Sequence, residues 1–262
     1  MKKYFWGIDC GSTEIKIVVL DQSGKVLAKH KRRTLFPLMS HVSEAISETH
    51  INPFDKGQLS EEHSLVATGY GRHSISWATD RITEIKAHFL GVQAQLHLRE
   101  PFTIVDIGGQ DSKVISASPT KVLDFVINRK CAAGTGAYIE ELAHRLEIKL
   151  ADLAALESKH DKDLTLNSYC TVFAGQEVIK ILVGGEKVEN LIHALYVSVA
   201  KRVLEMWSFS HDTLVFSGGV MQYHQPLYRI FSEKLPGRKV ILASEAQFCG
   251  ALGAAQYALK HC

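Results

Sequence analysis

The sequence predicts an α/β protein made of two related subdomains, and three observations support this prediction. A strand-and-turn pattern that begins near Asp9 is repeated near Asp106. A strand, a glycine turn and a helical stretch follow one another from Thr213. The composition of the 262-residue chain, 46% hydrophobic and 22% charged, is that of an ordinary globular protein. A chain of this length can bury two cores, or form one large α/β unit divided by a cleft.

Each copy of the repeat begins with an apolar run that predicts a strand, at residues 5–8 and 102–105. The turns that follow, DCGSTEIK at 9–16 and DIGGQDSK at 106–113, place Asp, Gly and Lys at the same three offsets. In the first copy a second predicted strand covers 15–20, and the tripeptide Lys-Val-Leu follows at 25–27. In the second copy the same two features lie at 114–116 and 121–123. This order predicts a β-meander in each subdomain, with the first hairpins facing each other across a cleft.

The residue types in the two turns favour phosphate binding. Glycine lets backbone N–H groups approach phosphate oxygens, and Ser12, Thr13 and Gln110 add side-chain donors. An acidic residue at a strand end, such as Asp9 or Asp106, can hold Mg²⁺ through its water shell. Two ordinary hairpin turns in a duplicated fold would explain the glycines, but not the Asp and Lys that both turns keep. The pair therefore predicts one polyphosphate bound from two sides.

Later segments of the chain have simpler interpretations. The strand at 213–216 leads through SGGV to a helical stretch at 221–235, an order suited to a nucleotide at a helix N-terminus. Residues 188–207 predict a core helix, and residues 52–62 a polar loop. Small residues at helical spacing in 249–255 (CGALGAA) predict close helix packing.

Two of the five cysteines precede helical patterns. Cys131 lies in NRKCAAGTGAYIEEL (128–142), and Cys170 comes just before another helical run. Helix N-termini favour a thiolate or an anionic group that it ligates. Two thiolates are half of a four-thiolate site, so a symmetric dimer would be needed to complete a [4Fe–4S] cluster or a Cys₄ zinc site. A buried cysteine is also commonly an inert core residue, and the residues alone leave these alternatives open.

The remaining composition excludes several classes of protein. A formal net charge of +2 argues against nucleic acid or an anionic membrane as the main partner. The N-terminus reaches Asp9 before a signal-peptide core can form, and no uncharged run is long enough to span a bilayer, so we expect a cytoplasmic protein. Thirteen histidines are scattered without metal-ligand spacing. Cys10 and Cys249 are expected to be packing residues and Cys262 a terminal thiol.

The turns at 9–16, 106–113 and 217–219 resemble the phosphate-1, phosphate-2 and adenosine motifs of the actin, hexokinase and sugar-kinase superfamily. This resemblance covers nearly the whole chain. It implies an actin-like ATPase fold: two ribonuclease-H-like subdomains with ATP and Mg²⁺ in the cleft between them. We expect the subdomains at residues 1–97 and 98–262, with the cysteines in the second and the last helix packing back on the first.

A narrower resemblance rests on four motifs: ATGYGR at 67–72, DIGGQDSK at 106–113, KCAAGTG at 130–136 and CTVFA at 170–174. They are similar to the activator ATPases of 2-hydroxyacyl-CoA dehydratases and to the ATPase subunits of benzoyl-CoA reductases. In that family a homodimer holds one [4Fe–4S] cluster between two cysteines of each subunit, and ATP drives electron transfer to a partner iron–sulfur dehydratase or reductase. Cys131 and Cys170 match the cluster ligands, and a reduced ferredoxin or flavodoxin would supply the electron.

The sequence departs from this family beside both cysteines. Gly175 and Gln176 stand where the family has an acidic and a small polar residue, although Glu177 is in place. Residues 128–130 are basic where an acidic spacer is expected. These departures concern the cluster potential and the choice of partner more than the ligands.

The resemblance also assigns roles to the motif residues. Asp9 and Asp106 are expected to position Mg²⁺ and water, and Gln110 the attacking water. The remaining expected contacts with the nucleotide are Gly11, Ser12, Thr13, Lys16, Gly108, Gly109, Gly134, Gly136, Gly218 and Gly219. Two rival functions are a small-metabolite kinase of the same fold with structural or zinc-binding cysteines, and a non-catalytic ATP-binding regulator. A kinase would need a carboxylate base beside the acceptor hydroxyl, and this sequence contains no clear substrate-domain insertion that would supply one.

Overall fold

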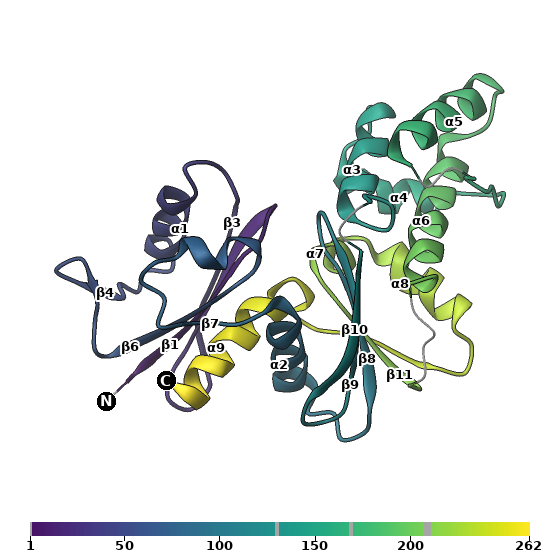
Figure 1. Cartoon of the computed structure of the whole chain (residues 1–262). Coiled ribbons are helices and arrows are strands. Elements are labelled where there is room, and N and C mark those ends of the chain that lie inside the picture. The colour runs from purple at the N-terminus through teal and green to yellow at the C-terminus, as the bar shows by residue number, and fades with distance from the viewer. Residues whose placement is uncertain (1, 129–130, 168–169, 207–210) are drawn as a thin grey trace. The chain divides into compact units, whose positions relative to one another are not determined.

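The computed structural model describes residues 2–128, 131–167, 170–206 and 211–262. The chain divides into two compact units. Each unit contains a five-stranded sheet with helices, which confirms the predicted α/β class (Figure 1). Unit 1 consists of Met1–Glu100, Ala117–Val122 and Ala243–Cys262, and unit 2 of Pro101–Ser116 and Leu123–Leu242.

The sheet of unit 1 contains the first predicted meander. Its strand order is β3-β2-β1-β6-β7, with β1 antiparallel to β2 and parallel to β6. The strands are β1 (Tyr4–Cys10), β2 (Glu14–Leu20), β3 (Val26–Arg33), β6 (His63–Thr68) and β7 (Asp80–Arg81). Side chains alternate between the two faces of this sheet. Phe5 therefore joins a core with α2 (Glu84–Leu96) and α9 (Cys249–His261), whereas Trp6 and Ile8 pack with α1 (Leu38–Ser47).

Helix α9 packs on β1 and α2 with almost no space between the backbones (Figure 1). A Cβ added to Gly7 would lie 1.9 Å from the carbonyl oxygen of Ala251, and one on Gly253 would lie 1.8 Å from that of Ala87. Such distances exclude any side chain. The predicted packing role of the small residues at 249–255 is confirmed.

The sheet of unit 2 contains the second predicted meander, in the order β10-β9-β8-β11-β12. Its strands are β8 (Phe102–Ile107), β9 (Ser112–Ala117), β10 (Val122–Asn128), β11 (Thr213–Ser217) and β12 (Lys239–Leu242). Strand β11 runs parallel to both β8 and β12, so the glycine turn after β11 lies at the same sheet edge as the turn after β8.

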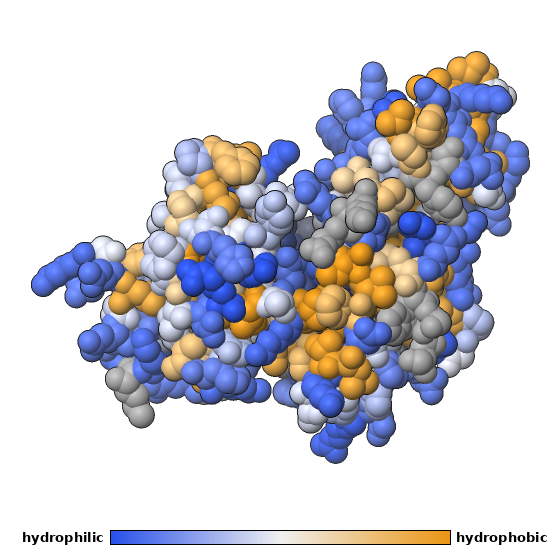
Figure 2. Space-filling model, viewed as in Figure 1, coloured by the Kyte–Doolittle hydropathy of each residue, from blue (hydrophilic) through white to orange (hydrophobic). Residues whose placement is uncertain are grey.

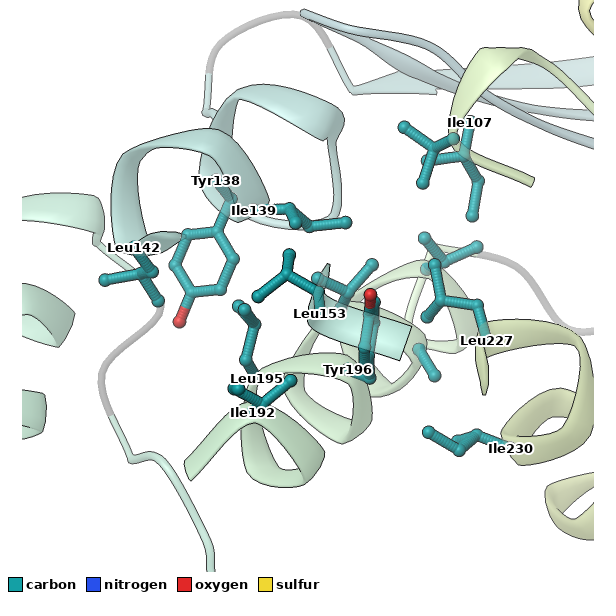
Figure 3. Packing of buried hydrophobic residues seen from close by; sticks show 14 of the residues in the cluster. Ile107, Tyr138, Ile139, Leu142, Leu153, Ile192, Leu195, Tyr196, Leu227 and Ile230 are labelled. Carbon is teal, nitrogen blue, oxygen red and sulfur yellow. The ribbon is translucent and has the colours of Figure 1, made fainter. Parts of the chain in front are cut away.

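The helices of unit 2 share a large hydrophobic core with this sheet. Tyr138, Leu153, Ile192 and Leu227, from four helices, converge in this core (Figure 3). The helices are α3 (Gly136–Arg145), α4 (Leu153–Glu157), α5 (Thr171–Val183), α6 (Val188–Leu204), α7 (Gly219–Tyr223) and α8 (Gln225–Lys234). Short 3₁₀ turns cover Tyr70–Ser74, Leu150–Asp152 and Ala246–Phe248.

Three sequence expectations differ from the structure in detail. The single helix expected at 221–235 is two helices, because His224 leaves the helical conformation. Pro226 lies in the first turn of the second helix, where its missing N–H costs no hydrogen bond. The loop expected at 52–62 contains a hairpin, β4 (Phe54–Asp55) and β5 (Gln58–Leu59). The core helix expected at 188–207 is present as α6, and residue 207 lies outside the described residues.

The described part of the chain contains no helix that is both long enough and apolar enough to cross a membrane.

A buried histidine makes the stability of unit 2 sensitive to acid. The Nδ1 atom of His224 lies 2.8 Å from the hydroxyl of Tyr196, and both side chains are buried. Burial lowers the pKa of His224 from 6.5 to about 4. The imidazole therefore stays neutral in the folded protein at pH values where the unfolded chain takes up a proton.

We predict that the free energy of unfolding falls as the pH drops from about 6.5 toward 4. For one such group the loss near pH 5 is on the order of 2 kcal/mol. Denaturant unfolding at neutral pH and at pH 5 measures it, and His224→Gln should remove most of the difference. The exposed His144→Gln is the control. Equal acid sensitivity in His224→Gln and the wild type would contradict the assignment.

Candidate functional site

The two repeated turns close with the same hydrogen bond. The amide of Gly11 donates to the carbonyl oxygen of Glu14 (3.1 Å), and the amide of Gly108 donates to that of Asp111 (2.9 Å). A Cβ on Gly11 would lie 2.9 Å from the oxygen of Glu14, and one on Gly108 would lie 3.0 Å from Oδ1 of Asp111. A side chain at this offset would therefore crowd the turn in both copies, which favours the glycine that the repeat places there.

Asp9 ends β1 with its carboxylate held between two glycines. Only 8% of Asp9 is exposed. A Cβ on Gly69, where φ is +87°, would lie 2.7 Å from Oδ1 of Asp9, and one on Gly250 would lie 2.9 Å from Oδ2 and 3.3 Å from Nε2 of His88. The sequence analysis did not assign His88 or Gly250 to the site. They lie far from Asp9 in sequence, and only the packing of α2 and α9 brings them to it.

Hydrogen bonds from Thr34, the residue after β3, hold the rest of the first turn. Thr34 donates its amide to the carbonyl oxygen of Thr13 (2.9 Å) and its hydroxyl to that of Gly11 (2.8 Å). Ser12 is exposed at the tip. Lys16 pairs with Asp9 in the strand register, and its side chain is 14% exposed. The turn thus presents a hydroxyl and a lysine on a fixed backbone.

Asp106, at the matching position of unit 2, is buried with its own charge partner. Nζ of Lys113 lies 3.3 Å from Oδ2 of Asp106 and 2.7 Å from Oδ1 of Asp111, and the hydroxyl of Ser217 donates to Oδ1 of Asp106 (3.1 Å). A Cβ on Gly218, at φ +95°, would lie 2.7 Å from the same Oδ1. The structure therefore brings the first residues of the predicted adenosine motif to the predicted phosphate turn. A buried carboxylate needs such compensation.

Two further predicted residues stand at open positions. Gln110 is exposed at the tip of the second turn. Gly219 is the first residue of α7, and a Cβ there would meet no atom within 4 Å. Both positions can be approached by a ligand.

The second turn is bonded directly to the N-terminus of α3. The amide of Gly136 donates to the carbonyl oxygen of Gly108 (2.9 Å), and the amide of Ala137 donates to that of Gly109 (2.7 Å). A Cβ on Gly136 would lie 3.1 Å from Cα of Gly109. The first two amides of α3, which a helix leaves without internal acceptors, are thus satisfied by the turn.

The loop that carries Cys131 is tied to the same turn. The hydroxyl of Ser112 donates to the carbonyl oxygen of Gly134 (2.5 Å). The side-chain amide of Asn128 donates to the carbonyl oxygens of Cys131 (3.0 Å) and Ala133 (2.8 Å). This loop is therefore bonded to the Asp106 turn at Gly134 and to β10 at Cys131 and Ala133, and the side chain of Cys131 is partly exposed.

The helix after Cys131 begins at Gly136, at the end of the Ala-Ala-Gly-Thr-Gly stretch, as the sequence indicated, but Cys131 is not at its N-terminus. Gly134 has φ +81° and Thr135 is extended, so the chain turns before the helix can start at Gly136. Cys131 accordingly lies in the loop before α3 and not at its N-terminus. Cys170, in contrast, is the N-cap residue of α5, as predicted, and it is exposed. The motif positions 129, 130 and 169 lie outside the described residues.

The surroundings of Cys170 account for one departure from the family pattern. A Cβ on Gly175 of α5 would lie 2.6 Å from the guanidinium carbon of Arg145 at the end of α3. An acidic side chain at this position would have to displace Arg145. Glu177 accepts from the amide of Asn167 (3.0 Å) and from its side chain (3.1 Å), so it holds the segment that leads to Cys170.

The other three cysteines behave as predicted. Cys10 is buried in the core of unit 1, and burial, followed by the charge of Asp9, raises the pKa of its thiol to about 12. Cys249 is buried at the start of α9, where its Sγ lies 3.2 Å from Nε2 of Gln95. Cys262 is exposed at the terminus.

Comparisons with known proteins confirm the resemblance. The model of the BadF/BadG/BcrA/BcrD ATPase family matches residues 6–258. The (R)-2-hydroxyglutaryl-CoA dehydratase activating ATPase of Acidaminococcus fermentans is 36% identical, over 99% of this chain and 98% of the relative.

Two solved structures support the same conclusion. One is component A of the Acidaminococcus fermentans (R)-2-hydroxyglutaryl-CoA dehydratase, with a TM-score of 0.87 and 34% identity over 99% of this chain and 98% of that one. The other is the 2-hydroxyisocaproyl-CoA dehydratase activator of Clostridium difficile with bound ADPNP, with a TM-score of 0.84 and 31% identity over 98% and 94%. The predicted fold class, an actin-like ATPase, is confirmed.

The burial of the thiols predicts a clear order of reactivity in metal-free protein. Cys170 and Cys262 should be alkylated first, and Cys10 and Cys249 should react slower by roughly two orders of magnitude or more, because both are buried and burial also raises the pKa of the Cys10 thiol. Peptide mapping after timed alkylation measures the order, with unfolded protein as the control in which all five react. If Cys10 were labelled as fast as Cys170 in folded protein, the burial of Cys10 in the core would be contradicted.

Proposed function

Because the chain belongs to the BadF/BadG/BcrA/BcrD ATPase family, we propose that it is an ATP-dependent reductive activator. It couples ATP hydrolysis to one-electron transfer to a partner iron–sulfur enzyme of the 2-hydroxyacyl-CoA dehydratase or benzoyl-CoA reductase type. The names of the relatives support this proposal: two are activators of 2-hydroxyacyl-CoA dehydratases, and another belongs to a benzoyl-CoA reductase as one of its subunits.

The observation that carries the proposal is the hydrogen-bonded path within unit 2. The carbonyl oxygens of Gly108 and Gly109 hold the start of α3, and Ser112 holds the loop that carries Cys131. A phosphate that shifts the turn must therefore also shift that loop. This connection gives ATP hydrolysis a physical route to a redox group at the cysteines.

Nucleotide binding is assigned to the two turns. Asp9 and Asp106 position Mg²⁺ and water. Asp106 already has Lys113 as its counter-charge, which favours contact with the metal through water over direct ligation. Gln110, exposed at the turn, orients the attacking water. The phosphate and adenosine contacts are assigned to Gly11, Ser12, Thr13, Lys16, Gly108, Gly109, Gly218 and Gly219, and Gly134 and Gly136 support the second turn through α3.

Cys131 and Cys170 are suited to hold a [4Fe–4S] cluster. Both are free thiols outside the hydrophobic core, and Cys170 lies at the N-terminus of a 13-residue helix, where backbone amides favour an anionic group. When bound, the cluster supplies a one-electron donor of low potential. Four thiolates require two chains, so we propose a homodimer with one cluster.

The surface beside Cys170 supports this dimer. Val172, Phe173, Ile179 and Val183 of α5 are all more than half exposed. Figure 2 shows hydrophobic side chains at the surface of this helix, at the top right of the view. A second copy of the chain would remove this apolar area from water.

The electron is proposed to come from a reduced ferredoxin or flavodoxin in the cytoplasm. For a one-electron transfer, about 59 mV corresponds to a tenfold change in equilibrium, or about 1.4 kcal/mol. Reaching an acceptor a few hundred millivolts lower therefore needs several kcal/mol, which ATP hydrolysis can supply.

The test is the iron and acid-labile sulfide content of protein purified without oxygen. We expect about two irons per chain, lost together with dimerisation in Cys131→Ala and in Cys170→Ala. Cys262→Ala, which removes an exposed terminal thiol, is the matched control and should keep both. Iron-free monomeric protein that still turns over ATP would refute the activator and favour the small-metabolite kinase.

The proposed nucleotide site predicts variants that lose ATP hydrolysis but keep their iron. Asp9→Asn and Asp106→Asn should each lower the kcat for ATP hydrolysis about 100-fold or more, because a neutral amide holds Mg²⁺ and its water poorly. Their iron content should stay at the wild-type value. Asp55→Asn, on an exposed hairpin, is the control. Unchanged hydrolysis in both active-site variants would exclude these carboxylates from the reaction.

A further inference from the structure

Three side chains that the proposed function does not use meet at the end of α4. Potential ligand atoms of Glu157, His160 and His193 lie within 4.8 Å of one another. The histidines showed no metal-ligand spacing in the sequence, because His160 follows α4 and His193 lies on α6. We propose that His160, His193 and the neighbouring Asp163 bind a divalent transition-metal ion, with Zn²⁺ as the expected ion. This proposal does not depend on the activator function.

The hydrogen bonds of the two histidines leave the correct nitrogen for a metal. Nδ1 of His193 lies 2.8 Å from Oε1 of Glu157, and Nδ1 of His160 lies 2.7 Å from the carbonyl oxygen of Glu157. A carboxylate or carbonyl oxygen only accepts, so Nδ1 carries the hydrogen in both rings. Nε2 is then the nitrogen of each ring that can ligate a metal, and at His193 the ion would replace any proton that Nε2 shares with Asp163.

Glu157 orients the site and is not itself a ligand. It is 2% exposed, and Oε1 contacts the guanidinium of Arg229 as well as His193. These two partners occupy the oxygen and offset its buried charge. In metal sites, a ligating histidine commonly donates its other ring N–H to a carboxylate, which orients the ring.

A second carboxylate stands on the other side of His193. Oδ1 of Asp163 lies 3.3 Å from Nε2 of His193, although the Asp163 side chain is 90% exposed. The backbone before it is anchored, because the side chain of Asn190, one turn earlier on α6, accepts from the amides of Asp161 (2.9 Å) and Lys162 (3.2 Å). Asp163 is therefore held beside His193 and can turn its carboxylate toward an ion.

Besides the turn of the Asp163 carboxylate, the His160 ring must move to bind an ion. The rings of His160 and His193 are stacked, 3.8 Å between centroids and 3° from parallel. His160, 23% exposed and in the segment after α4, must swing so that both Nε2 atoms point to one centre. Two imidazoles and a carboxylate suit Zn²⁺, Co²⁺ or Ni²⁺, whereas Mg²⁺ and Ca²⁺ prefer oxygen ligands alone.

An ion here would act on the segment that leads to Cys170. His160 and Asp163 lie between α4 and α5, and Glu177 holds the same segment further along at Asn167. Ligation to His193 would attach this segment to α6 at a second point beside Asn190. The expected role of the metal is structural.

Cobalt provides the test, because its absorption reports its ligands. Anaerobic wild-type protein should bind one Co²⁺ per chain, in competition with Zn²⁺. The difference spectrum against the same protein without cobalt should show d–d bands and no new thiolate charge-transfer band. Asp163→Asn and His160→Gln should each weaken binding at least tenfold. Both side chains are outside the core, and equal thermal midpoints would show that the variants are folded. His144→Gln, exposed on α3, is the matched control and should bind as the wild type does.

Two results would overturn the proposal. One is no Co²⁺ bound at micromolar concentration by folded wild-type protein, which would leave Glu157, His193 and Asp163 as an ion-pair network. The other is binding that shows a thiolate band and is unchanged in both variants, which would place the ion at cysteines. Neither result bears on ATP hydrolysis or iron content, so the activator function is tested separately.

Discussion

The two hydrogen bonds from the start of α3 to the carbonyl oxygens of Gly108 and Gly109 are the interaction on which the site depends. A helix N-terminus needs acceptors from outside the helix, and a turn at a strand end has carbonyl groups that no ladder uses. Here each satisfies the other. The contact is close, since a Cβ at position 136 would lie 3.1 Å from Cα of Gly109. The Asp106 turn and the loop that carries Cys131 thereby become one structural unit.

The two copies of the turn share their closure, but different residues surround their carboxylates. Gly69, Gly250 and His88 lie beside Asp9, and Lys113 and Ser217 contact Asp106. The lysines at matching positions differ accordingly, because Lys113 is buried between two carboxylates and Lys16 keeps 14% of its side chain exposed. Equivalent sequence positions therefore have different surroundings, which are set by the layers packed around each turn.

The segment before Cys170 is the other region where several constraints meet. Asn190 anchors its beginning, Glu177 anchors its end, and the histidine pair lies between α4 and α6. Gly175 admits the guanidinium of Arg145, which couples α5 to α3. The segment before Cys170 is thus positioned by contacts to α5 and α6, whereas the loop of Cys131 is held by Ser112 of β9 and Asn128 of β10. Substitutions in these elements are therefore expected to change the geometry of the thiols.

The sequence by itself determined the local features: the strands of both meanders, the glycine at the same offset in each turn, the helix that begins after Cys170, and the family. The strands, glycines and helix follow from periodicity and from backbone sterics over a few residues, whereas the family was indicated by the resemblance of four motifs. Only the tertiary structure decided that His88 and Gly250 flank Asp9, that Cys131 stays in a loop bound to Ser112 and Asn128, and that His160 stacks on His193. A periodic pattern tells which face of an element is buried. It does not tell which distant element covers that face, because this choice depends on contacts between residues far apart in the chain.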